Sequence, residues 1–183
     1  MRTIIYGGAV SLDGFLAGTD DALDWLHFSA DVQAVMAESL KDVDTILMGR
    51  KTYAIAAAEG GSGKPRKKRS RATPPPMRTY VFSRTLPSID APGVELVRGD
   101  AVAFVRDLKA KPGKKICLMG GGELATSLIA AGLVDEIGLN IHPILLGAGV
   151  PAFRDPGVRV RLTLTENRIL DGGCVLASYK VLT

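Results

Sequence analysis

The sequence predicts an α/β protein with a mostly parallel sheet, helices on both faces and an antiparallel strand pair at one edge. Apolar runs typical of strands alternate with segments of helical spacing along most of the chain. Residues 159–181 then hold two strand patterns joined by Asp171-Gly172-Gly173. With 183 residues and 46% hydrophobic composition, the chain suits one domain, 1–183, with its own core.

Each element follows from its local pattern. Ser29 and Asp100 are side chains suited to cap the helices that follow them, because their oxygens accept from free N–H groups. Gly132 is a C-terminal stop for a later helix. We expect helices from Ser29 to about Lys41 and over 50–58, 100–110 and 123–131, and strands over 2–10, 45–48, 79–82, 94–97, 115–119, 136–144, 159–166 and 174–181.

The net charge of +4 comes from one short segment. Six basic residues lie between Lys64 and Arg71, and without them 17 basic residues face 19 acidic ones. The surrounding stretch, 59–78, is rich in glycine, proline and charge, which predicts a flexible loop. Nucleic-acid binding through 64–71 is the less favoured alternative, because the tract has no interleaved aromatic residues.

The composition argues against several other classes of protein. No apolar run approaches the ~18 residues of a membrane span, and the N-terminus lacks a signal-peptide pattern, so we expect a cytoplasmic protein. The two cysteines, Cys117 and Cys174, lie inside apolar runs and are expected to be reduced thiols. No metal site is expected, because ligands at short spacing are lacking.

The strongest functional signal is a strand that runs into three glycines and a helix. Gly120, Gly121 and Gly122 follow the strand, and Glu123 and Leu124 open the helix. Glycines let the backbone approach a ligand closely, and a helix N-terminus offers free N–H groups at its positive end. This pattern predicts a pyrophosphate site, although a tight turn without a ligand is the alternative.

Two more strands end in side chains that suit phosphate. The first is followed by Gly49, Arg50, Lys51 and Thr52, and the second by Ser83 and Arg84. The guanidinium of Arg84 beside a hydroxyl suits the 2′-phosphate of NADP. All three motifs lie at carboxyl ends of expected parallel strands, where open α/β sheets bind ligands. Together they predict a ligand with a pyrophosphate and a further phosphate, although each alone is also typical of a solvated turn.

In this order the motifs resemble the dihydrofolate reductase superfamily. The sequence is more similar to the branch with the reductase domain of the riboflavin-biosynthesis deaminase-reductase, through Ser11-Leu12-Asp13-Gly14, Gly132–Glu136 and Pro143–Gly149. The resemblance covers roughly residues 3–181 and implies a dihydrofolate-reductase-like three-layer fold that binds NADPH. These 183 residues hold no CxxC zinc pattern of a deaminase, and the basic stretch 59–78 departs from the family pattern.

The resemblance implies an NADPH-dependent reductase of a small ring-containing substrate, of the pterin, pyrimidine or similar type, and a homodimer. An NADPH-binding protein without efficient turnover, or a true dihydrofolate reductase, are the alternatives. The implied nicotinamide contacts are Ala9 and Val10, with Gly14 and Phe15 closing over the ring. The implied phosphate contacts are Gly49, Arg50, Lys51, Thr52, Ser83, Arg84, Gly120, Gly121, Gly122, Glu123 and Leu124.

Two acids are candidate proton donors for the reduction. Asp13 follows the first strand beside the expected nicotinamide, although an Asp before Gly14 also suits a turn. Asp31 follows Trp25 at a helix start, which is similar to the Trp loop and acid of dihydrofolate reductases with one residue more between them. Helix-end electrostatics is the alternative for Asp31, so Asp13 is expected to matter more for turnover. Trp25 is expected to cover the substrate or to close the core.

Overall fold

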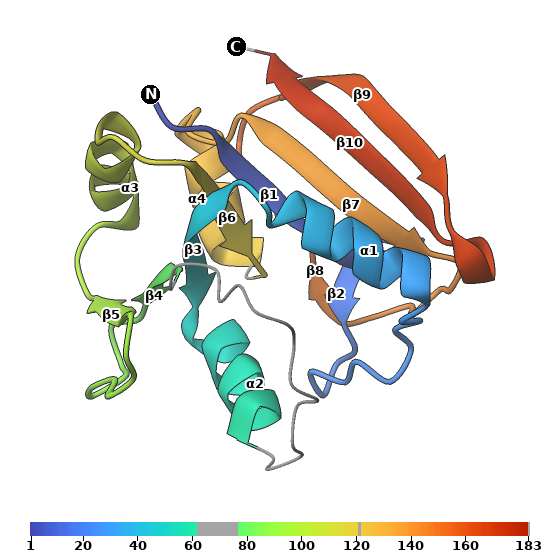
Figure 1. Ribbon diagram of the computed structural model, residues 1–183, viewed down its shortest axis with the longest axis horizontal. Helices are drawn as coiled ribbons and strands as arrows, with labels where there is room; N and C mark the ends of the chain where they lie inside the picture. Colours follow the sequence, from blue (N-terminus) through green and yellow to red (C-terminus); the bar gives the residue numbers. More distant parts are fainter. Residues whose placement is uncertain (62–76, 121, 183) are drawn as a thin grey trace.

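The computed structural model describes residues 1–61, 77–120 and 122–182. An eight-stranded sheet has the order β5-β4-β3-β6-β1-β7-β10-β9, and β2 and β8 form a second, two-stranded sheet (Figure 1). The strands are β1 (Ile4–Ser11), β2 (Phe15–Ala17), β3 (Val43–Gly49), β4 (Arg78–Phe82), β5 (Val94–Val97), β6 (Lys115–Met119), β7 (Glu136–His142), β8 (Val150–Pro151), β9 (Arg161–Ile169) and β10 (Val175–Leu182). The helices are α1 (Ala30–Ser39), α2 (Arg50–Gly61), α3 (Ala101–Ala110) and α4 (Gly122–Ala130).

Strand directions confirm the predicted fold class. All pairings from β5 to β7 are parallel, whereas β10 pairs antiparallel with both β7 and β9. Strands alternating with crossover helices account for the parallel part, because parallel neighbours need long connections. The closing hairpin accounts for the antiparallel edge, and it turns through a short 3₁₀ segment at Asp171–Gly173.

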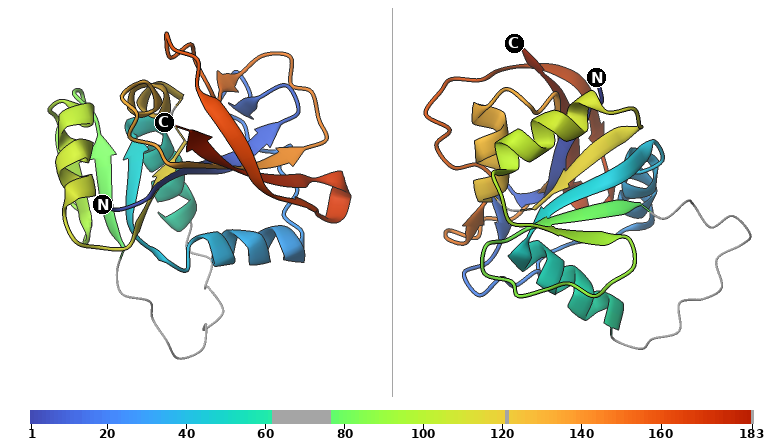
Figure 2. Two further views of the ribbon diagram at one scale, coloured as in Figure 1. Left: turned by 90° about the horizontal axis from the view of Figure 1, so that it is seen from above. Right: turned by 90° about the vertical axis from the view of Figure 1, so that its left-hand side faces the viewer.

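Helices cover the sheet on both faces, as Figure 2 shows. On one face α3 and α4 bury Val105 and Leu128 against Tyr6, Leu47 and Leu118 of the central strands, which forms the main core. On the other face α1 packs Val32 and Val35 onto β10, and Tyr53 of α2 packs onto β3 and β4. The result is the expected three-layer arrangement.

The predicted caps are confirmed, because each follows from short-range chemistry. The hydroxyl of Ser29 accepts from the N–H of Val32 at the start of α1, and the carboxylate of Asp100 accepts from two N–H groups of α3. Gly132 has the left-handed backbone, φ 65°, that its position after α4 requires.

Some predictions were wrong in detail. Strands β2 and β8 were missed, since each has two or three residues and they pair across most of the chain. The predicted loop at 59–78 begins too early and ends too late, because α2 continues to Gly61 and β4 begins at Arg78. The rest of that loop, 62–76, lies outside the described residues. Among the described residues, no helix is long and apolar enough to cross a membrane.

Candidate functional site

Four parallel strands end side by side at one edge of the sheet. In sheet order they are β4, β3, β6 and β1, and Gly49 at the end of β3 pairs with Phe82 at the end of β4. Met119, the last residue of β6, lies between Met48 and Gly7 of its neighbours. The fold therefore brings the three phosphate-type motifs and the loop after β1 to the same edge (Figure 1).

The two glycine-containing turns touch each other at this edge. A Cβ on Gly120, whose φ is +58°, would lie 2.4 Å from Oγ1 of Thr52. A Cβ on Gly122 would lie 2.4 Å from the carbonyl oxygen of Pro151 in β8. Contacts this close leave no room for a side chain at either position. Packing against Thr52 of α2 and Pro151 of β8 therefore requires glycine at 120 and 122, whether or not a ligand binds. Gly121 lies outside the described residues.

Two arginines at this edge are open to solvent. Arg50 and Arg84 are exposed, and neither forms an ion pair with another residue that the structure describes. Lys51 lies 3.3 Å from the carboxylate of Asp21; the Lys51 side chain is largely exposed and that of Asp21 is partly exposed. The exposed guanidinium groups offer planar, bidentate donors for an anion.

The hydroxyl of Ser83 has a structural task as well. Its oxygen accepts from the N–H groups of Thr85 and Leu86, at 3.2 and 3.0 Å, which fixes the turn after β4. The hydroxyl hydrogen remains a donor for a ligand.

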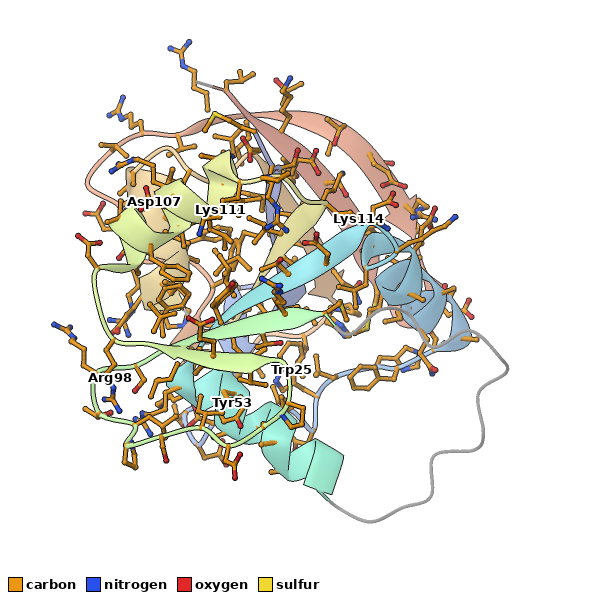
Figure 3. The ribbon with its side chains drawn as sticks, turned by 60° about the vertical axis from the view of Figure 1, so that its left-hand side comes forward. Trp25, Tyr53, Arg98, Asp107, Lys111 and Lys114 are labelled. Carbon is orange, nitrogen blue, oxygen red and sulfur yellow. The ribbon has the colours of Figure 1, made fainter. Side chains whose placement is uncertain are left out.

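Arg98 is a further cation at this edge that the sequence motifs did not single out. It directly follows β5, the neighbour of β4, and its guanidinium donates to the carbonyl of Pro87 at 2.6 Å. Figure 3 shows Arg98 on the turn between β5 and α3. The signal is present in the sequence, since Arg98 is the first residue after β5 and Arg84 is the second after β4.

The first turn of α4 offers its backbone more than its side chains. The carboxylate of Glu123 pairs with Arg154 at 3.2 Å, and Leu124 packs against the main core. At Glu123 and Leu124, an anion would therefore bind to the backbone N–H groups and not to the side chains.

The end of β1 exposes few side-chain atoms to the proposed site. Val10 is buried, and Ala9 is half-buried opposite Asn140 of β7. Asn140 was also missed: its Oδ1 is buried with no hydrogen-bond partner among the described residues, and its Nδ2 lies 3.2 Å from Nε2 of His142. Burial, and secondly the neighbouring His27, lower the pKa of His142. A neutral His142 is thus part of the wall of this region.

Trp25 contacts His142, and Asp31 lies in the first turn of α1. The Trp25 ring packs edge-on against His142, with ring centroids 5.3 Å apart. Figure 3 shows Trp25 on the loop before α1 and Tyr53 on α2. The carboxylate of Asp31 contacts the Ser29 hydroxyl and accepts from the N–H groups of Val32 and Asp171, each at 2.7 Å. These bonds, that from Ser29 foremost, lower the pKa of Asp31.

Asp13 accepts hydrogen bonds from its own loop after β1 and from the segment after β7. Oδ1 accepts from the Ser11 hydroxyl at 2.6 Å and from the N–H of Leu146 at 3.2 Å, and Oδ2 accepts from the N–H of Gly147 at 2.7 Å. The bond from Ser11 is the largest cause that lowers the pKa of Asp13. Among the described residues, Asp13 and Asp31 share no hydrogen-bond partner: Asp13 contacts the segment after β7, whereas Asp31 contacts the turn before β10.

The comparisons with known proteins agree with this geometry. The model of the RibD C-terminal domain family matches residues 2–176. The uncharacterized protein YyaP of Bacillus subtilis is 36% identical over 180 residues, which cover 97% of this chain and 94% of YyaP. A solved structure from Shewanella sp. PV-4, of a proposed riboflavin biosynthesis protein, is 26% identical, with a TM-score of 0.81 and 100% of both chains covered.

Dihydrofolate reductase from Enterococcus faecalis, solved with NADP(H), has a TM-score of 0.67 at 17% identity, and the match covers 99% of this chain and 97% of that one. This likeness confirms the predicted dihydrofolate-reductase-like fold. The family match also confirms the branch to which the sequence motifs pointed. The chain belongs to the RibD C-terminal domain family.

Proposed function

We propose that the protein is an NADPH-dependent reductase that transfers a hydride to a small ring-containing substrate of the pyrimidine or pterin type. One observation carries the proposal, namely the row of four parallel strand ends with their glycines and exposed arginines. Membership of the RibD C-terminal domain family supports an oxidoreductase. The riboflavin-biosynthesis description of the Shewanella protein favours a pyrimidine over a pterin.

In this proposal the cofactor lies along the edge from β4 to β1. Ser83 and Arg84 hold the 2′-phosphate, and Gly49 to Thr52 with the first turn of α4 hold the pyrophosphate. The nicotinamide lies at Ala9 and Val10, next to Gly14 and Phe15. The buried oxygen of Asn140, opposite Ala9, has no hydrogen-bond partner in the described part of the chain and fits a region completed by a bound polar group.

When bound, NADPH supplies the hydride, and the protein orients the two reacting rings. The two predicted proton donors, Asp13 and Asp31, are not assigned that role. Both carboxylates accept hydrogen bonds that lower their pKa, whereas a general acid at neutral pH needs a raised one. We propose instead that solvent supplies the proton.

The experiment is a panel assay of NADPH oxidation with pyrimidine, pterin and dihydrofolate substrates, combined with NADPH titration. Oxidation with a pyrimidine or pterin supports the proposal, and a preference for dihydrofolate would favour a true dihydrofolate reductase. Tight NADPH binding without turnover across the panel would favour a binding protein. Absence of NADPH binding would exclude the cofactor assignment.

We further propose a homodimer that forms at the β9 side of the sheet. β9 is an edge strand; its Leu162 and Leu164 are exposed, as are Phe153 and Val158 in the segment before it. Exposed edges with clustered apolar side chains are typical of association surfaces. Light scattering at micromolar concentration should give twice the chain mass, and Leu162→Lys should give the monomer. A monomeric wild-type protein would contradict this.

A further inference from the structure

We propose that Asp13 is a positioning residue that fastens the loop after β1 to the segment after β7 and thereby sets the shape of the nicotinamide pocket. We call its bonds to Leu146 and Gly147 the Asp13 latch. The role in cofactor binding rests on the proposed function, whereas the latch itself rests on contacts within the chain.

The loop after β1 is held from within by Ser11. The N–H of Gly14 donates to the Ser11 carbonyl, and the N–H of Phe15 donates to the Ser11 hydroxyl, both at 2.9 Å. The same hydroxyl donates to Asp13, so one buried side chain connects the turn backbone to the carboxylate. The position of Asp13 is therefore coupled to that of Gly14 and Phe15.

The segment after β7 forms backbone hydrogen bonds with this loop at several positions. The N–H of Leu12 donates to the carbonyl of Ile144, and the N–H of Ala152 donates to the carbonyl of Gly14, both at 2.9 Å. β2 and β8 pair directly beyond, and a Cβ on Gly149 would lie 2.0 Å from the Ala17 carbonyl oxygen. The carboxylate of Asp13 adds a charged acceptor between the Leu12–Ile144 bond and the Gly14–Ala152 bond.

The donors around Asp13 decide its chemistry. Three groups donate to its two oxygens, which is the environment of an ionised carboxylate that acts only as an acceptor. Charge-assisted bonds to backbone N–H groups are shorter and stronger than neutral ones. An ionised Asp13 accepts all three of these bonds at once, which suits a residue that holds the loop in place.

The test compares Asp13→Asn and Asp13→Ala with Asp155→Asn. Asp155 is a matched control because, within the described part of the chain, its carboxylate accepts one local bond, from the N–H of Gly157 at 2.8 Å in an exposed turn. Hydrogen exchange at the amides of Leu146 and Gly147 should accelerate in both Asp13 variants and stay unchanged in the control. Unchanged exchange at these amides would overturn the latch.

The second readout separates positioning from catalysis and from stability alone. At a temperature well below unfolding, the NADPH dissociation constant should rise roughly fivefold or more in the Asp13 variants. The pH profile of kcat/KM should keep its shape, whereas loss of a proton donor would remove one limb. An unchanged affinity, or a lost limb, would overturn the positioning role.

Ser11→Ala should weaken NADPH in the same way, and the double variant Ser11→Ala with Asp13→Asn should add little to either single change. Independent, additive effects would contradict a shared latch. If the wild-type protein binds no NADPH, the proposed function fails, while the exchange measurement still decides whether the latch exists.

Discussion

The two edges of the central sheet use charge in opposite ways. At the amino ends of the strands, Arg2 pairs with Asp44 and Lys109 pairs with Asp135, and both cations are buried. At the carboxyl ends, Arg50 and Arg84 are exposed and form no ion pair with any described residue.

The buried cations are also fully engaged with the backbone. Arg2 donates to the carbonyl of Lys114 at 2.7 Å, and Lys109 donates to the carbonyl of Leu133 at 3.0 Å. Burying a charge is tolerated only with such partners. The buried cations of the amino edge therefore hold the fold together, whereas Arg50 and Arg84 at the carboxyl edge are open to solvent and to a ligand.

The largest expected effect is on stability, from a change at the amino edge. Asp135→Ala should lower the free energy of unfolding by about 2–3 kcal/mol, because it leaves the Lys109 ammonium buried without its carboxylate. The exposed pair of Glu38 with Arg168 gives the control, since Glu38→Ala should cost less than about 1 kcal/mol. Urea denaturation measures the free energy of unfolding of both variants. Equal losses of that free energy would contradict the distinction between the buried and the exposed ion pair.

The next effect is on cofactor choice, from a change at the carboxyl edge. Arg84→Ala should weaken NADPH binding roughly tenfold or more, since a lost charge-assisted phosphate contact costs ~1.5–3 kcal/mol. NADH binding and unfolding free energy should remain nearly unchanged. Arg106→Ala, an exposed arginine of α3, is the matched control. Equal losses for NADPH and NADH in a titration would remove Arg84 from the 2′-phosphate site.

The smallest effect concerns pH. Burial acts to raise the pKa of Asp44, but the Lys114 N–H, the Thr45 hydroxyl and Arg2 together lower it below its usual value. A carboxyl with a lowered folded-state pKa stabilises the fold above about pH 4, and that contribution is lost as the pH falls through the folded-state value. Asp44→Asn should therefore be destabilised at pH 7, with the difference from wild type shrinking in acid. A difference independent of pH would contradict this.

The sequence predicted the features that depend on short stretches of chain. Ser29 and Asp100 cap their helices as expected, because a cap needs only the next three residues. The three phosphate-type motifs met at one edge because strand-helix repeats force parallel strands, whose ends must coincide.

Features that depend on distant partners were not predicted. Strands β2 and β8 lack a pattern of their own, since their pairing comes from backbone bonds across the chain. Asp13 was predicted to be the proton donor because it follows β1 beside the expected nicotinamide. Its hydrogen bonds from Leu146 and Gly147 could not be predicted, because these donors lie more than a hundred residues further along the chain. The buried oxygen of Asn140 was missed because its burial depends on the strands packed around β7, although its partner His142 is only two residues away.

Hydrogen exchange with and without NADPH tests the central claim most directly, because it compares the two sheet edges in one experiment. We predict that NADPH slows exchange at the carboxyl edge, over residues 9–15, 49–53, 83–86 and 122–124. At the amino edge, residues 42–45, 113–116 and 133–136 should be unaffected. Protection at the amino edge, or none at the carboxyl edge with saturating NADPH, would contradict the assignment of this edge as the cofactor site.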